Sequence, residues 1–401
     1  MSLTHDRGRE LPRGRARLLA TIAAAALAAS AIGACGSSSS SSSSAQAAGS
    51  ASASASGSAA KVNWSTVTSA QAAGGMSALI AAAKKEGQLN VITLPANWAN
   101  YGTQMREFSQ MYGIRIHDAI PSGSSAQEIQ AIETGRGSST APDVVDVGES
   151  FAVADANLFA PYRVQTWNDI PAANKDPDAR WYNDYGGYMS FGCDLKVVPS
   201  CPTTWSGLES PAYRHAVALN GIPGQAGAAT GAVFAAAINT GGSLNDAKPG
   251  LEFFNKLKSM GNFNATDCDA SSLIEAGQCP IIVNWDFLNV AGAWGLPSTA
   301  KWKVVVPKGT PLGEFYAQAI SKTAPDPAAA RLWEEFLYST QGQNNFLRGY
   351  ARPVELAAMV KDGTVDQAAY RQLPPVPGTP ALPTPAQTTA AAKLIAAGWS
   401  S

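Results

Sequence analysis

The chain has 401 residues, with 29 basic and 30 acidic side chains and a formal net charge of −1. This balance argues against nucleic acid or an anionic lipid surface as a partner, because both usually require a strongly basic protein surface. The length, together with 45% hydrophobic residues and ten Trp, is sufficient for two lobes with sizeable cores.

The first 34 residues have the features of a cleavable export signal. Five Arg lie between residues 7 and 17, and an apolar stretch from Leu18 to Ile32 is too short to span a bilayer comfortably. It ends in small residues directly before Cys35, which matches the bacterial lipobox, in which the cysteine is lipidated and becomes the new N-terminus. The alternative is an ordinary secretory signal followed by a chance cysteine. We favour lipidation, since the segment that follows makes sense as a tether only if its start is anchored.

Residues 35–60 are predicted to be a disordered tether. After Cys35 they are almost entirely Ser, Ala and Gly, including an unbroken serine run from Ser37 to Ser44. Such a composition cannot offset the entropy lost on ordering. Removal of residues 1–34 takes away five Arg and two acidic residues, which changes the net charge to about −4. The sequence therefore predicts an exported protein, lipid-anchored through Cys35 to the outer face of the cytoplasmic membrane.

The first part of the folded region alternates between helices and strands. Helices are predicted at 76–85, 104–112 and 125–133, and strands at 89–93, 114–119 and 141–147. Ser125-Ala-Gln-Glu128 is read as a capping box that opens the third helix. This alternation indicates a parallel sheet covered by helices, with a ligand crevice beyond the carboxyl ends of the strands.

A second α/β pattern follows an aromatic, glycine-containing stretch at 181–202. Strands are predicted at 217–219, 280–284 and 302–306, and helices at 226–238, 251–260, 328–338, 341–347 and 387–397. A proline-rich crossing at 374–385 precedes the last helix, and no internal repeat is evident.

The four cysteines other than Cys35 form two close pairs in the sequence. Cys193 is followed by Cys201, and Cys268 by Cys279. In an exported protein, an even number of cysteines in local pairs predicts two disulfides. A metal site would need ligands from distant segments and lacks any C-x-x-C motif, so no metal is expected.

Several segments resemble the solute-binding proteins of bacterial ABC importers. They are Leu79–Gly87, Ala141–Gly148, Pro202–Trp205, Pro280–Asp286 and Ala328–Leu337. Each is weak alone, but together they extend over nearly all of residues 75–355. The resemblance is to the cluster that includes ferric-iron, polyamine, thiamine and aminoalkylphosphonate binders.

The resemblance implies an α/β, two-lobed type II periplasmic-binding-protein fold, with two crossover strands and a ligand cleft between the lobes. Lobe 1 would comprise 61–192 and 303–401, which includes the C-terminal helices, and lobe 2 would comprise 193–302. The crossovers are expected near Tyr188–Asp194 and Lys303–Pro307. The implied function is capture of a small polar ligand and its delivery to a membrane permease, by a monomer with no cofactor and no chemistry on the ligand.

Five candidate ligand contacts lie where strands of the first pattern end. Trp98 and Tyr101 follow the first strand, although they could equally pack against the neighbouring helix. Ser124 and Ser125 lie at a helix N-terminus, where free N–H groups can bind a polar group, although plain capping explains Ser125 equally well. Glu149 and the neighbouring Asp146 flank Gly148, and one of them could be structural.

The other candidates are Tyr188, in the predicted crossover, and the pair Trp285-Asp286. An indole beside a carboxylate suits an amine, through cation–π attraction and a charge-assisted hydrogen bond. The alternative is that Trp285 fills the core and Asp286 caps a helix beginning at Phe287. We expect an organic cation such as a polyamine as the ligand.

Ferric iron, an aminoalkylphosphonate and a secreted hydrolase are the alternatives. The iron binders of this family use adjacent tyrosines, and this chain has no Tyr-Tyr pair. An anion could use the serine-rich helix start with Arg352, but no basic cluster is evident. Asp146 and Glu149 could act as the carboxylate pair of a carbohydrate-active hydrolase, whereas no G-x-S-x-G, H-E-x-x-H or Gly-Lys motif is present.

Overall fold

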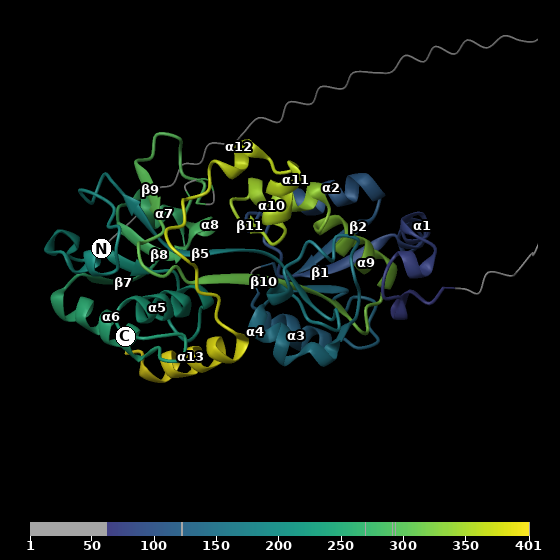
Figure 1. Cartoon of the computed structure of the whole chain (residues 1–401), viewed down its shortest axis with the longest axis horizontal. Helices are drawn as coiled ribbons and strands as arrows, with labels where there is room; N and C mark the ends of the chain where they lie inside the picture. The colour runs from purple at the N-terminus through teal and green to yellow at the C-terminus, as the bar shows by residue number, and fades with distance from the viewer. Residues whose placement is uncertain (1–61, 122, 269, 291, 293, 401) are drawn as a thin grey trace, which may run out of the picture. The chain divides into compact units, whose positions relative to one another are not determined.

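The computed structural model describes residues 62–400 except 122, 269, 291 and 293. The predicted signal peptide, the tether and Cys35 lie outside the described residues. The described residues belong to one compact unit, shown in Figure 1. None of its described helices combines the length and the apolar character that a membrane span requires.

The first part of the chain forms the predicted succession of helices and strands. Its elements are α1 (Met76–Glu86), β1 (Gln88–Ile92), α2 (Tyr101–Tyr112), β2 (Arg115–Ala119), α3 (Ser125–Thr134), β3 (Val144–Gly148) and α4 (Glu149–Ala154). Gly87 and Gly113 end α1 and α2 with φ of 74° and 70°, a left-handed conformation that glycine adopts without strain. β1 and β2 pair in parallel, as the alternating pattern predicts.

The large sheet is mixed, whereas the sequence pattern predicts a parallel one. Its strands lie in the order β3, β10 (Gly313–Ser321), β5 (Tyr182–Asp194), β8 (Ile281–Trp285), β6 (Val217–Leu219) and β7 (Phe263–Asp267). The short strands β4 (Phe159–Ala160), β9 (Trp302–Val305) and β11 (Arg352–Pro353) pair at its sides. The pairs among β3, β10, β5 and β8 are antiparallel, while β6 runs parallel to β7 and β8.

β5 and β10 connect two bodies of the molecule. The first body contains α1, β1, β3 and α9 (Pro327–Leu337), and the second contains α5 (Gly227–Asn239), α6 (Lys248–Met260), β6 and β8. Figure 1 shows the two long strands passing between them. β5 pairs with β10 over its first half and with β8 and β9 over its second half, so it crosses where the sequence places the first crossover.

The second crossing lies later than predicted. Residues 302–305 form β9, which pairs only with the far end of β5, and the chain returns to the first body along β10. β10 was missed because two polar residues, Glu314 and Gln318, interrupt its apolar pattern. Gln318 is fully buried, which is unusual for an amide side chain, and Glu314 is half-buried and lines a cavity described below.

The second body depends on close helix packing. α5 consists mainly of small residues, and its Ala229, Ala232 and Ala236 are fully buried. A Cβ on Gly250 of α6 would lie only 2.0 Å from the carbonyl oxygen of Val233, so no larger residue fits at this crossing. The small side chains therefore allow α5 to lie between α6 and β8.

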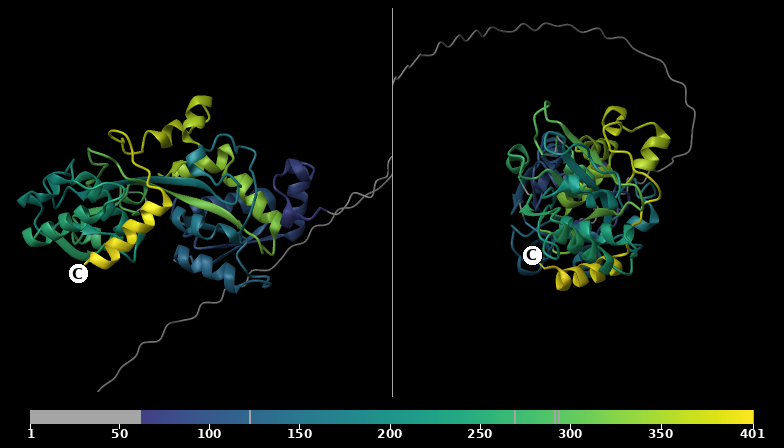
Figure 2. Two further views of the ribbon diagram at one scale, coloured as in Figure 1. Left: turned by 60° about the horizontal axis from the view of Figure 1, so that its bottom comes forward. Right: turned by 90° about the vertical axis from the view of Figure 1, so that its left-hand side faces the viewer.

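The remaining helices complete both bodies. They are α7 (Ser271–Glu275), α8 (Asp286–Asn289), α10 (Thr340–Arg348), α11 (Leu356–Asp362), α12 (Gln367–Tyr370) and α13 (Pro385–Gly398). α13, which the sequence assigns to lobe 1, contacts α5 and α6 of the second body as well as α4. Figure 2 shows it running along the second body toward the first. The lobe boundaries at 192 and 302 remain a prediction.

Both disulfides form as the sequence predicts. Cys193 pairs with Cys201, and Cys268 with Cys279, with Cα–Cα distances of 5.5 and 6.0 Å. Cys193 is the penultimate residue of β5, so its bridge fixes the loop that leaves the crossing strand.

Loss of the first bridge is expected to destabilise the protein moderately. Replacing Cys193 and Cys201 together by serine should lower the free energy of unfolding by about 2–3 kcal/mol, because a short closed loop no longer constrains the unfolded chain. Urea unfolding of the two proteins measures this difference. Identical unfolding midpoints would contradict a stabilising role.

Candidate ligand-binding site

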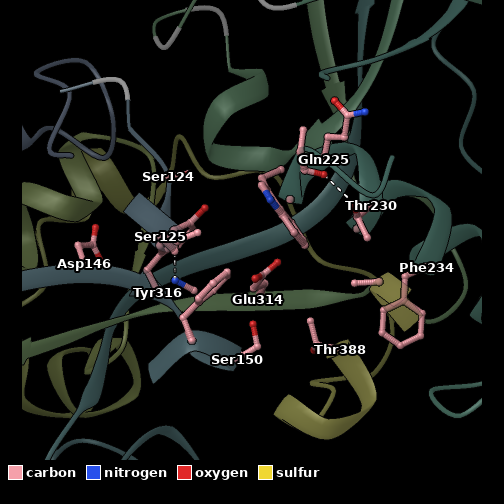
Figure 3. A pocket seen from close by; sticks show the side chains of 18 of the residues that line it. Ser124, Ser125, Asp146, Ser150, Gln225, Thr230, Phe234, Glu314, Tyr316 and Thr388 are labelled. Carbon is pink, nitrogen blue, oxygen red and sulfur yellow. Dashed lines mark hydrogen bonds between the residues drawn. The ribbon is translucent and has the colours of Figure 1, made fainter. Parts of the chain in front are cut away.

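A cavity of about 690 Å³ is lined by residues of both bodies (Figure 3). Three of its lining residues are acidic: Glu128, Asp146 and Glu314. Its aromatic residues are Trp98, Phe151, Phe234, Trp285 and Tyr316, and its hydroxyl and amide residues are Thr93, Ser124, Ser125, Ser150, Gln225, Thr230 and Thr388. No Lys, Arg or His is among the described residues that line it.

The start of α3 contributes two serines and a carboxylate. The capping box is formed by Ser124 and Gln127, one residue before the predicted position. This shift turns Ser125 toward β3, where its Oγ accepts a hydrogen bond from the Gly148 N–H at 3.1 Å. It also turns Glu128 inward, where the side chain is 1% exposed and Oε2 accepts from the Asp146 N–H at 3.0 Å. Burial and the nearby Asp146 raise the pKa of Glu128 well above its usual range.

Asp146 presents one oxygen that has no protein partner. Its Oδ2 accepts from the Tyr185 hydroxyl at 3.0 Å, and that hydroxyl accepts from the Trp98 indole N–H at 2.6 Å. Its Oδ1 is buried and has no hydrogen-bond partner among the described residues. Burial raises the pKa of Asp146 to about 7. Asp146 therefore lines the cavity with a carboxyl group whose hydrogen bonds are incomplete.

Glu314 lies near the middle of the cavity, and Glu149 stands beside it. In Figure 3 the Glu314 side chain lies between Tyr316 and Phe234. Burial raises the pKa of Glu314 to about 7, and the neighbouring Glu149 adds to this rise. Burial likewise raises the pKa of Glu149 to about 7, and a hydrogen bond with the Asn183 side chain partly opposes this rise. A positive ligand would relieve the repulsion between these carboxylates.

Four of the eight predicted contacts line the cavity: Trp98, Ser124, Ser125 and Trp285. Trp98 is half-buried and makes edge-to-face contacts with Phe287 and Tyr316, whereas Trp285 is 2% exposed. The indole of Trp285 also lies close to Gly231 of α5. Trp285 therefore belongs both to the core and to the wall of the cavity.

The other four predicted contacts are not among the described residues that line the cavity. Tyr101 is fully buried and donates to Asp184 Oδ2 at 3.0 Å, and Glu149 adjoins the lining residues Gly148 and Ser150. Tyr188 stacks under the Arg352 guanidinium, 4.9 Å from the ring centre. The fourth residue is Asp286.

Asp286 is engaged within the protein. The residue is fully buried, and its carboxylate forms an ion pair with Arg352. Its Oδ1 accepts from the N–H groups of Tyr188 and Phe287, at 2.9 and 3.0 Å. Asp286 is therefore paired within the protein, but it is the first residue of α8 and not the predicted cap, since Trp285 is the N-cap residue and no side chain caps this helix. Arg352 is not among the residues that line the cavity.

Sequence reasoning did not single out Glu128, Glu314, Gln225, Thr230 or Thr388 as ligand contacts. Glu128 was read only as part of a capping box, and Glu314 lies in the strand that was missed. Gln225, Thr230 and Thr388 come from the second body and the C-terminal helix. A polar residue between apolar ones in a strand was the only signal available for Glu314.

Two bodies joined by crossing strands, with a cavity lined from both, define a receptor of the periplasmic-binding-protein class. A family model described as bacterial extracellular solute-binding protein matches residues 140–374, and the chain belongs to this family. No curated protein matches the chain.

Solved structures with the same fold share little sequence with the chain. An ABC transporter substrate-binding protein from Bradyrhizobium japonicum has a TM-score of 0.60 at 15% identity, covering 78% of this chain and 100% of its own. A putative spermidine/putrescine ABC transporter from Listeria monocytogenes has a TM-score of 0.57 at 15% identity, covering 78% and 98%. Iron-bound HitA from Pseudomonas aeruginosa has a TM-score of 0.56 at 17% identity, also covering 78% and 98%.

The predicted family and fold are therefore confirmed. The protein is the solute-binding component of an ABC transporter, an extracellular or periplasmic receptor that binds a small solute and does not transform it. The hydrolase alternative is not supported by this family.

The carboxyls of the site predict an unusual pH dependence of stability. In the folded state Asp146, Glu149 and Glu314 each have a pKa of about 7. In the unfolded chain their pKa values return to the ordinary range of 3.8 to 4.5. The folded state binds more protons in this window, so the free energy of unfolding of the ligand-free protein should fall as the pH rises from about 5 to about 8. Urea unfolding across this range measures the slope. A slope of the opposite sign would contradict the pKa assignment.

Proposed function

We propose that the solute is a small organic cation, a class that includes the polyamines. The observation that carries this proposal is that three carboxylates, and no basic side chain, are found among the described residues that line the cavity. A cleft lined by charges of one sign attracts ligands of the opposite sign and raises their local concentration. An anionic solute would meet repulsion there.

The aromatic residues support the same proposal. Trp98 and Tyr316 line the cavity on the same side as Asp146, and the face of an aromatic ring attracts an ammonium group. Asp146, whose Oδ1 has no hydrogen-bond partner among the described residues, adds a carboxyl group to this side of the cavity. Contacts from both bodies would favour the closed arrangement when the solute is bound.

The observations favour neither iron nor a phosphorylated ligand. The described residues contain no group of three or more His, Cys, Asp or Glu side chains placed to hold a metal ion. A phosphate or phosphonate usually binds Arg or Lys, whereas none of the described residues that line the cavity is basic. Iron and phosphonate ligands are included in the binding screen described below, where a shift restricted to them would contradict the cation proposal.

We further propose that the receptor acts as a monomer tethered to the membrane by lipid on Cys35, and that it passes its solute to the permease of the transporter. The lipobox pattern and the Ser/Ala/Gly segment after it support this proposal. Radiolabelled palmitate incorporation into the wild type, but not into a Cys35→Ser variant, would test the anchor.

The ligand proposal is tested by a thermal-shift screen of the full chain. The panel contains putrescine, spermidine, choline, thiamine, aminoethylphosphonate, ferric citrate and simple sugars. A ligand present at a hundred times its Kd should add about 2.7 kcal/mol, which corresponds to several degrees. Shifts restricted to cations support the proposal, and shifts restricted to phosphonate, iron or sugar contradict it.

A further inference from the structure

The C-terminal segment extends beyond the region that matches the family and reaches the cavity. The match ends at residue 374, and the chain continues through a proline-rich stretch into α13. Pro383, Thr388, Ala391 and Ala392 of this segment all line the cavity. Part of the ligand-binding wall therefore comes from outside the family-matched residues.

This segment is fixed to the protein at both of its ends. At its start, the Ala381 N–H donates to the Pro311 carbonyl at 2.8 Å, and the Gly313 N–H of β10 donates to the Ala381 carbonyl at 3.0 Å. At its end, the Lys258 ammonium lies 3.9 Å from the ring centre of Trp399, which also packs edge-to-face against Phe254 at 5.8 Å. α13 is thus packed firmly against the second body.

The middle of α13 is closely fitted as well. Ile395 is fully buried, and a Cβ on Gly224 would lie 2.6 Å from Ala396. Gly224 itself lines the cavity directly before α5, so α13 and the start of α5 form one continuous wall. Thr388 is half-buried, whereas its neighbour Thr389 is exposed.

The charged groups of the cavity belong to other elements than this wall. All three lining carboxylates belong to α3, β3 and β10, while the second body and α13 contribute Gln225, Thr230, Phe234 and Thr388. Figure 3 shows Asp146 on one side of the cavity, Phe234 and Thr388 on the opposite side, and Glu314 between them. The cavity therefore has an acidic end and an uncharged end.

We infer that α13 is a specificity wall that contacts the uncharged end of the ligand, with Thr388 as a size-determining residue. The solute then carries its positive charge at one end and an uncharged, weakly polar group at the other. This inference rests on the proposed function for the acidic end. It disfavours a polyamine charged at both ends as the preferred solute.

The position of the wall is tested first, without a ligand. Thr388→Cys and Thr389→Cys are each made in the full chain carrying Cys35→Ser, and their rates of reaction with a trimethylammonium and a sulfonate methanethiosulfonate reagent are compared. The ratio of the cationic to the anionic rate should be about tenfold higher at position 388 than at position 389, because only the former faces the acidic cavity.

Two results of this experiment distinguish the two claims. If the cysteines at positions 388 and 389 react at equal rates and with equal cationic-to-anionic ratios, the claim that α13 forms a wall of the cavity is overturned. A slower reaction at position 388 with both reagents, but no preference for the cationic one, would support the wall and contradict the cation proposal.

The specificity is then tested with Thr388→Phe and the matched control Thr389→Phe. The probes are ω-amino alcohols from ethanolamine to 6-aminohexanol and the α,ω-diamines of equal length. Wild type should bind each long amino alcohol more tightly than its diamine. Thr388→Phe should weaken the binding of 6-aminohexanol by about tenfold and the binding of ethanolamine by less than about twofold. Thr389→Phe should change neither affinity. Equal losses for short and long probes, or tighter binding of the diamines, would overturn the inference.

Discussion

Replacement of Glu314 by glutamine is expected to weaken the binding of an organic cation by about 10- to 100-fold, because one charge-assisted hydrogen bond becomes a neutral one. Glu314 lies near the middle of the cavity, and its high pKa results from burial and from Glu149. Glutamine has nearly the same shape, so the fold should be retained. Calorimetric titration of the amine that gives the largest thermal shift measures the change.

Glu275→Gln provides the matched control for this prediction. Glu275 is exposed at the end of α7 and does not line the cavity, so its replacement should leave affinity unchanged. If Glu314→Gln binds the amine as tightly as the control variant does, the cation is bound elsewhere.

Replacement of Asp286 by alanine is expected to destabilise the protein strongly. The change leaves the Arg352 guanidinium buried without its ion-pair partner, which should lower the free energy of unfolding by about 3–5 kcal/mol. Urea unfolding measures this loss, and Asp362→Ala, at an exposed position of α11, serves as the control. The double variant Asp286→Ala with Arg352→Met should lose less free energy of unfolding than the two single variants lose together, since it leaves no unpaired buried charge.

This prediction distinguishes the structural role of Asp286 from a ligand-binding role. The structural role predicts that any Asp286→Ala protein that remains folded retains its affinity for the solute. Loss of affinity without loss of stability would instead support the first interpretation of the sequence, in which Asp286 contacts the ligand.

Local sequence patterns predicted most of the helices and strands. Gly87 and Gly113 mark helix ends because glycine adopts positive φ without strain, and the apolar run at 280–284 could be read as a buried strand. β10 could not be read in the same way, since its apolar pattern is interrupted by Glu314, which lines the cavity, and by Gln318, which donates hydrogen bonds to Tyr101 and Asp184. The second crossover was therefore placed on β9, the nearest strand with a clear pattern.

The site was less predictable because it depends on contacts between distant residues. Asp286 is 66 residues from Arg352, so no local pattern reveals that its charge is already paired. Glu128 belongs to the cavity only because the capping box begins at Ser124 instead of Ser125. Thr388 reaches the site from the last helix, and its role depends on how α13 packs against α5.

The most direct test of the cation-binding claim is a calorimetric titration with an amine at about pH 7 in two buffers of different ionisation enthalpy. Two carboxyls that line the cavity, Asp146 and Glu314, are partly protonated at this pH, because each has a pKa of about 7. A bound cation lowers these pKa values, so the account predicts that binding releases protons to the buffer. Binding of the amine without proton release, or with proton uptake, would contradict the claim that these carboxylates hold the solute.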